Sequence, residues 1–221
     1  MFKYLSIKNR LLIISIVPLV TLVTILLFII VSQVTSLIST VEESAGKMLI
    51  ESKKEELKNT VDLAYNSIKT IYNTDGDRND AITLLQRLQF GKDGYIFGYD
   101  DKAVRLFNGS NEAGIGNSYV DFKDVNGIYL IRDLIAAGRS NKLGQGNEFV
   151  TYHFPKPNEK IPSPKLSYSI FLERWDLMIG VGIYVDSIEK ESAVFKAHVE
   201  EVSTTLMTLV TIISVVLIGL M

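Results

Sequence analysis

The sequence predicts an α+β domain, in which helices pack on an antiparallel sheet, with a membrane-spanning helix on either side of the domain. Two uncharged runs predict the spans: Leu11–Val31 holds 21 residues and Val202–Met221 holds 20. Between them, residues 32–72 have the apolar spacing of a long helix, and the segments that follow alternate strand signals with helix signals. That order of elements is typical of an α+β domain.

Each uncharged run is long enough to cross a hydrocarbon core of about 30 Å at about 1.5 Å per residue. The first run exceeds the roughly 7–15 apolar residues of a cleaved signal peptide, so we expect an uncleaved helix. Pro18 lies inside this run, and a membrane helix tolerates such a proline as a mild kink. The residues before it include Lys3, Lys8 and Arg10 and no acid. This bias predicts a cytoplasmic N-terminus.

We therefore expect residues 1–10 in the cytoplasm, residues 11–31 and 202–221 in the plasma (inner) membrane, and residues 32–201 on its outer side. The outer segment contains all 25 acidic residues, and an excess of acid does not favour nucleic acid as a partner. The sequence stops at the end of the second span. Either the protein is truncated, or an effector part follows Met221.

Several kinds of chemistry lack their motifs in this sequence. There is no cysteine, and the two histidines, His153 and His198, lie on different predicted elements, so no metal-ligand spacing exists. The acids after Asn73 depart from a calcium loop at its sixth and twelfth positions. No dinucleotide loop, P-loop or nucleophile elbow is present. We expect no metal site, no cofactor and no enzymatic activity.

Residues 32–72 predict one continuous helix of roughly 60 Å. Its apolar residues recur in steps of four and three, which is a period near 3.5. A single amphipathic helix of this length needs a partner. The following domain can cover its distal half. For the proximal half the chain itself offers only the helix that enters the second span, so we expect a second copy of the chain, hence a homodimer.

The elements after this helix follow from local signals. The stretch Asn73–Asp80 breaks the helix, and Asn79 or Asp77 is expected to cap a short helix over 81–90. Residues 95–100 and 103–108 predict a hairpin, and residues 127–138 predict a helix closed by Gly138. Three further strands are expected at 147–154, 165–172 and 177–185, with a proline-rich loop over 155–164. A last helix, capped by Asp186, leads into the second span.

The first hairpin contains candidate pocket residues. Tyr95, Phe97 and Tyr99 alternate along its first strand, which places the three rings on one face. Such a stripe fills a core or lines a pocket, since pockets are themselves mostly aromatic and apolar. By the same period, Arg105 and Phe107 are expected to share a face of the second strand.

Five motifs occur in order: "GKDGYIFGYD", "DFKDVNGIYLIRDLI", "FVTYHFPKP", "SPKLSYSIF" and "WDLMIGVGIYVDSI". Together they resemble the single-Cache (type 2) sensor domains of bacterial chemoreceptors and sensor kinases, over roughly residues 72–191. The resemblance implies a PAS-like extracytoplasmic module that binds a small metabolite on one sheet face, often acetate, propionate, pyruvate or lactate. The ligand-binding positions it implies are Tyr95, Phe97, Tyr99, Tyr152, Lys165 and the face of the second strand.

One departure from the family pattern concerns the end of the second strand. Where family members often have alanine-histidine-proline, this chain has Leu106, Phe107 and Asn108, so Phe107 replaces a protonatable residue. Arg105 could supply a cation instead, because its guanidinium grips a carboxylate in a bidentate manner. Phe107 would suit a ligand with a larger hydrocarbon part. Trp175 is expected to pack rather than to contact ligand.

We therefore expect the input half of a chemoreceptor that senses a small metabolite, most simply an organic acid, and signals across the membrane. Its output would reach a cytoplasmic adaptor and kinase through a part downstream of Met221. Two alternatives stay open. The chain could be the input domain of a sensor histidine kinase or cyclase, or it could be a membrane interaction module without a sensing role.

Overall fold

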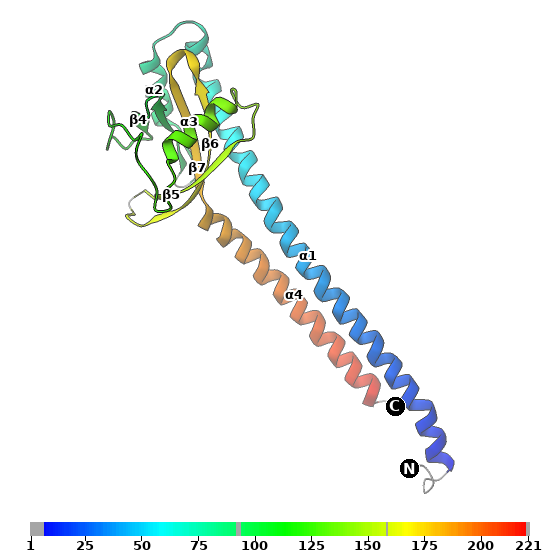
Figure 1. The fold of residues 1–221 in the computed structure, drawn as a ribbon. Coiled ribbons are helices and arrows are strands. Elements are labelled where there is room, and N and C mark those ends of the chain that lie inside the picture. Colours follow the sequence, from blue (N-terminus) through cyan, green and yellow to red (C-terminus); the bar gives the residue numbers. More distant parts are fainter. Residues whose placement is uncertain (1–6, 92–93, 158, 220–221) are drawn as a thin grey trace. The chain divides into compact units, whose positions relative to one another are not determined.

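The computed structural model describes residues 7–91, 94–157 and 159–219 (Figure 1). The chain divides into two compact units. Residues 49–190 form the sheet domain, and the helical segments before and after them form the second unit. The functional residues predicted from the sequence all lie in the sheet domain.

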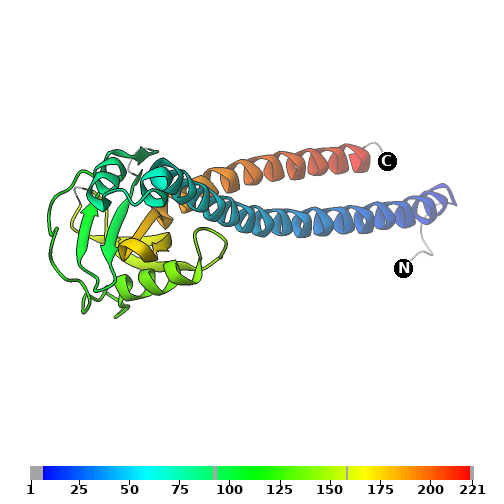
Figure 2. The ribbon, with the colours of Figure 1, turned by 90° about the horizontal axis from the view of Figure 1, so that it is seen from above.

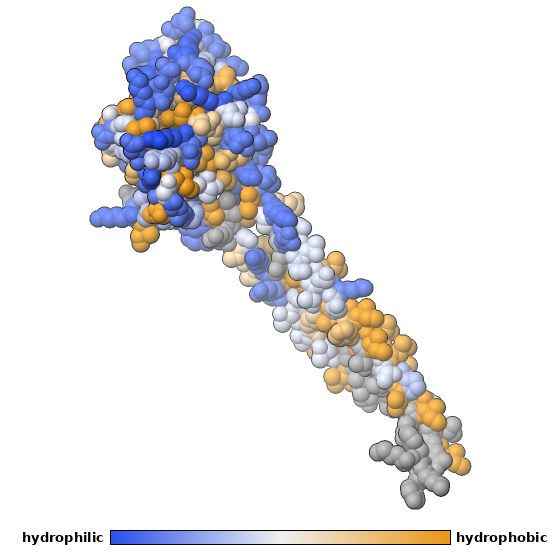
Figure 3. Space-filling model, in the orientation of Figure 1, coloured by the Kyte–Doolittle hydropathy of each residue, from blue (hydrophilic) through white to orange (hydrophobic). Residues whose placement is uncertain are grey.

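The second unit consists of parts of two long helices. Helix α1 spans Ile7–Asn73 without interruption, and Pro18 lies inside it. Helix α4 spans Val185–Gly219. Hydrophobic residues are prominent on the helices in Figure 3, and hydrophilic residues predominate on the sheet domain. This contrast agrees with the two uncharged runs of the sequence.

Among the described residues, one helix is long and apolar enough to cross a membrane, judged by length and composition. It begins at Ile14 within α1, and its most apolar 18-residue window has a mean hydropathy of 3.0 with none of it buried. The predicted second span lies on α4 up to Gly219, and residues 220–221 fall outside the described residues. A span there stays a prediction.

The sheet domain is built on five antiparallel strands in the order β4-β3-β7-β6-β5. Their bounds are β3 Phe97–Asp100, β4 Arg105–Asn108, β5 Phe149–Pro155, β6 Pro162–Leu172 and β7 Leu177–Tyr184. A separate ribbon pairs β1 (Gln89–Phe90) with β2 (Gly94–Tyr95). This architecture confirms the predicted α+β fold with a PAS-like antiparallel sheet.

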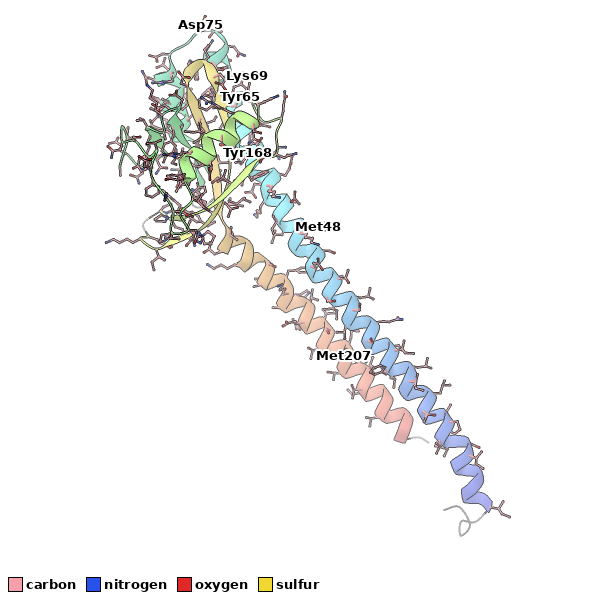
Figure 4. The ribbon with its side chains drawn as sticks, in the orientation of Figure 1. Met48, Tyr65, Lys69, Asp75, Tyr168 and Met207 are labelled. Atoms are coloured by element: carbon pink, nitrogen blue, oxygen red, sulfur yellow. The ribbon has the colours of Figure 1, made fainter. Side chains whose placement is uncertain are left out.

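Helices cover both faces of this sheet (Figure 2). The distal part of α1 and α2 (Arg78–Arg87) pack on one face around Leu57, Ile68, Leu85 and Tyr168, the last labelled in Figure 4. Helix α3 (Leu130–Ser140) packs on the other face. Strand β6 therefore has both faces buried. We call the two sides the α1 face and the α3 face.

Several element boundaries differ from the sequence prediction. Asp77 does cap α2, because its carboxylate accepts from Asn79 N at 2.8 Å, but α2 begins at Arg78 and ends at Arg87. Gly138 does not close α3, which continues to Ser140; a Cβ on Gly138 would lie 3.1 Å from the carbonyl carbon of Ile170. That glycine serves close helix–sheet packing instead. The expected loop over 155–164 is shorter, because β6 begins at Pro162.

A β-bulge separates two residues that were predicted to share a face. Along β4, Phe107 pairs with Gly98 and Arg105 pairs with Tyr99, so Leu106 is an extra residue and the register shifts there. An extra residue on one strand reverses the alternation of the side chains beyond it. Arg105 therefore lies with Tyr99, and Phe107 enters the α1-face core with no exposed surface. The prediction that they share a face is wrong.

Candidate ligand-binding site

An inner cavity lies between α3 and the sheet. It is lined by Tyr95, Phe97, Tyr99, Asn108, Leu130, Ile131, Leu134, Tyr152, Phe154 and Lys165. The space open to the centre of a water molecule is about 10 Å³, which is room for about one water. A metabolite of several heavy atoms therefore needs side chains of the lining to move, or must extend beyond this cavity.

Lys165 is the charged residue of the inner cavity. It pairs with Tyr152 on β5 and with Tyr184 on β7, and only 1% of its surface is exposed. Its ammonium donates to Tyr95 Oη at 3.0 Å and lies 4.4 Å from the centre of the Tyr95 ring. The rings of Phe97, Phe154 and Tyr184 surround it at 5.4, 5.7 and 5.1 Å.

A glycine on β7 makes this position of Lys165 possible. A Cβ on Gly182 would lie 2.6 Å from Lys165 Cε and would overlap Ser167 Oγ. Gly180 similarly leaves room for the ring of Phe97, 2.7 Å from where its Cβ would stand. The glycines of "IGVGIY" thus admit the lysine stem and an aromatic ring to the α3 face.

Lys165 forms no ion pair with a carboxylate in the part of the chain that the structure describes; one tyrosine oxygen and four ring faces are its neighbours. Burying a charge without a counter-charge is costly. Ring faces compensate a cation only in part, by roughly 0.5–2 kcal/mol each. An anion delivered to Lys165 would remove most of this cost, because it would supply the missing counter-charge.

Two tyrosines of the inner cavity, Tyr99 and Tyr152, are held in their neutral form. Burial raises the pKa of Tyr99 to about 12 against the opposing influence of Arg105. Burial also raises the pKa of Tyr152, whose hydroxyl lies 2.9 Å from Ser167 Oγ. These side chains keep their protons at neutral pH, and a phenolic hydroxyl can donate to an anion.

Arg105 borders a larger outer pocket of about 420 Å³, which shares Tyr95, Asn108 and Phe154 with the inner cavity. Its Nε donates to Tyr99 Oη at 2.9 Å, and a terminal nitrogen donates to Ala113 O at 3.0 Å. The guanidinium lies 4.0 Å from the centre of the Tyr119 ring. Arg105 therefore lines the outer pocket, is hydrogen-bonded to Tyr99 of the aromatic stripe, and is absent from the inner lining.

The structure brings together five of the seven predicted site residues at the inner cavity: Tyr95, Phe97, Tyr99, Tyr152 and Lys165. Arg105 lines the outer pocket, and Phe107 lies on the opposite face. Trp175 packs as expected, with its ring 4.9 Å from that of Tyr72.

Sequence reasoning missed Phe154, Asn108 and the α3 residues that roof the cavity. Phe154 was within reach, because it is two residues beyond Tyr152 on the same strand. The roof was not, since nothing local tells which helix lies over which face. The described residues contain no group of three or more histidine, aspartate or glutamate side chains placed to hold a metal.

A family model described as "Cache domain" matches residues 25–209. The chain belongs to the Cache-domain family. It is 35% identical, over 98% of its length, to the methyl-accepting chemotaxis protein CtpM of Pseudomonas aeruginosa, and 27% identical, over 87%, to the sensor histidine kinase MctS of Rhizobium johnstonii. It spans 39% and 42% of the length of these two relatives.

Solved structures agree with this assignment. A methyl-accepting chemotaxis protein of Vibrio parahaemolyticus superposes with a TM-score of 0.60 at 31% identity, covering 66% of this chain and 98% of that one. A Cache chemosensory domain solved to explain carboxylic acid recognition gives a TM-score of 0.55 at 24% identity, covering 63% of this chain and 97% of that one. The predicted resemblance to Cache sensor domains of chemoreceptors is confirmed.

Proposed function

We propose that this Cache protein is the input part of a chemoreceptor, and that it binds a small organic acid at Lys165 outside the cytoplasm. The observation that supports this best is a buried lysine with ring faces and a tyrosine hydroxyl around it and no carboxylate beside it. A carboxylate is the simplest ligand group that supplies its missing counter-charge. The carboxylic acid named for one structural neighbour is consistent with this chemistry.

In the proposed arrangement, residues 11–31 and 202–221 span the inner membrane and residues 32–201 lie on its outer side. The domain has a sensing role and no catalysis of its own. The chain acts as a homodimer and signals through a cytoplasmic adaptor and kinase by way of a part beyond residue 221. Binding would bias the packing of the sheet against its flanking helices, a switch between two arrangements.

A second candidate is the input part of a sensor histidine kinase, because one such protein matches 87% of this chain. Both candidates use the same ligand site and differ in the downstream sequence. Reading the coding region beyond residue 221 separates them.

The test is a thermal-shift and calorimetric screen of the full chain in lipid nanodiscs against acetate, propionate, pyruvate, lactate and succinate. Replacing Lys165 by methionine keeps the stem and removes the charge. We expect Lys165→Met to weaken binding of the best acid at least about 100-fold, the value of a charge-assisted contact of about 3 kcal/mol. The unfolding temperature without acid should be equal or higher, because an uncompensated buried charge is gone.

The matched control is Lys160→Met, which removes the charge of an exposed lysine in the loop between β5 and β6. This change should leave acid binding unchanged. If no acid shifts the wild-type chain, or if Lys165→Met binds the best acid as the wild type does, the proposed ligand class is wrong.

A further inference from the structure

The first turn of α4 forms an ion pair with a residue that lines the outer pocket. Asp186 is the second residue of α4, and its Oδ2 forms an ion pair with Lys156 Nζ. Lys156 follows directly after β5 and lines the outer pocket together with Pro155. One ion pair thus joins a pocket-lining residue to the helix that carries the predicted second span.

Tyr184 provides a second connection at the same place. It is the last residue of β7, directly before α4. Its hydroxyl donates to Pro155 O at 2.6 Å, and its ring lies 5.1 Å from Lys165 Nζ and 5.5 Å from Lys156 Nζ. The same ring therefore contacts the lysine of the inner cavity and the lysine of the outer pocket.

The Lys156–Asp186 pair is also less exposed to water than the two arginine–aspartate pairs of the domain. Its side chains are 22% and 31% exposed, whereas Arg174–Asp75 is 35% and 91% exposed and Arg132–Asp121 is 45% and 83% exposed. A pair withdrawn from water is screened less by salt and interacts more strongly. An acid in the first turn of a helix is favourable by itself. That preference does not account for a lysine that reaches it from the lining of the outer pocket.

We propose that Asp186 is a positioning residue that reports occupancy of the pocket to α4 through its ion pair with Lys156. The inference rests on the proposed function, because it needs an acid in the pocket. An acid that enters beside Lys165 and Tyr95 and extends into the outer pocket competes with Asp186 for the ammonium of Lys156, or displaces that ammonium from Asp186. The first turn of α4 then changes its attachment to the sheet domain. Coupling of this kind is reciprocal, so a change at Asp186 also alters acid affinity.

The test measures the position of α4 directly in the full chain. Because the sequence has no cysteine, Asp101→Cys and Val194→Cys give two unique spin-label sites, in an exposed turn of the sheet domain and at a 73% exposed position of α4. Pulsed electron paramagnetic resonance in nanodiscs records the label distance without acid and with the best acid of the five-acid panel. Saturating acid is used, so that a change in affinity does not hide the response.

We expect the acid to change the label distance in the otherwise wild-type chain. Asp186→Asn should reduce this change to less than half, while the acid still raises the unfolding temperature. Asp186→Glu, which keeps the charge, should restore it. Asp75→Asn, which removes the acid of the Arg174 pair, should leave it intact, as a control for loss of any ion pair.

Three results would overturn the inference. An acid that binds without changing the label distance would show that α4 does not receive the signal. An Asp186→Asn chain with the full wild-type change would show that the signal takes another route. If no acid of the panel binds the wild-type chain, the inference falls together with the proposed function, and the thermal-shift data identify this case.

Discussion

The two faces of the sheet contrast most clearly along strand β6. Leu166, Tyr168, Ile170 and Leu172 point to the α1 face, and all belong to one hydrophobic core. The alternate residues Lys165, Ser167 and Ser169 point to the α3 face, and all three are buried. One strand therefore carries an apolar row on one side and a mainly polar row on the other. We infer that the α1 face provides stability and that the α3 face provides binding.

The α3 face accepts its polar groups because most of them have partners. Ser169 Oγ donates to Leu134 O at 2.7 Å, and Ser167 Oγ lies 2.9 Å from the Tyr152 hydroxyl. Buried polar groups are tolerated when they are hydrogen-bonded. Lys165 differs from the serines, because its charge has no counter-charge among the described residues. This difference is the reason why we propose Lys165 as the residue that binds the ligand.

The largest effect on stability is expected from a cavity on the α1 face. Leu85 of α2 is completely buried there. Leu85→Ala should lower the free energy of unfolding by about 2–5 kcal/mol, the usual cost of a lost side chain plus its cavity. Acid affinity, measured by calorimetry at a temperature where the variant is folded, should stay within about twofold. If the free energy of acid binding falls by more than the free energy of unfolding, the proposed division of roles between the two faces is wrong.

Two glycine substitutions sharpen the comparison, because one adds a methyl group to the α1 face and the other adds a methyl group to the α3 face. A Cβ on Gly98 would overlap the ring of Phe107 on the α1 face, and a Cβ on Gly182 would press on Lys165 on the α3 face. Gly98→Ala should cost about 1–3 kcal/mol of stability with little change in binding. Gly182→Ala should weaken acid binding by about tenfold.

Denaturant titration and calorimetry on both variants separate the two outcomes. The double variant Gly98→Ala with Phe107→Leu serves as a control, since a smaller side chain relieves the overlap and should recover part of the stability. If Gly98→Ala weakens acid binding as much as Gly182→Ala does, Phe107 contributes to the ligand site from the far face.

The same residues show how far the sequence could predict the structure. Period-two alternation placed Tyr95, Phe97 and Tyr99 on one face, and their ring centres are indeed 6.3 Å apart in succession. It failed for Phe107, because alternation presumes an unbroken register and Leu106 is bulged out of it. Lys165 was predicted as a site residue from the family motif "SPKLSYSIF" and not from alternation. Its burial depends on Gly182 of the neighbouring strand, a contact that no local pattern reveals.

The smallest effect is expected from Asp124, in the loop that leads into α3. Its buried carboxylate accepts backbone N–H bonds from Asn126, Ile128 and His153 at 2.8, 2.9 and 2.9 Å, and so connects this loop to β5. Burial alone would raise the pKa of Asp124, but the bonds from His153, Ile128 and Asn126 outweigh it, and the pKa is lowered. A lowered folded-state pKa means that ionised Asp124 stabilises the folded domain.

This contribution is present above the unfolded-state pKa of about 3.9 and is lost as the pH falls through the lower folded-state pKa. Asp124→Asn should therefore be less stable than the wild type at pH 7, and the gap should narrow as the pH falls below about 4. Denaturant titrations between pH 3 and pH 7 measure it. Because the loop holds the start of α3, the helix that roofs the inner cavity, acid affinity at pH 7 should fall as well. A pH-independent gap would assign the loss to altered hydrogen bonding rather than to the charge of Asp124.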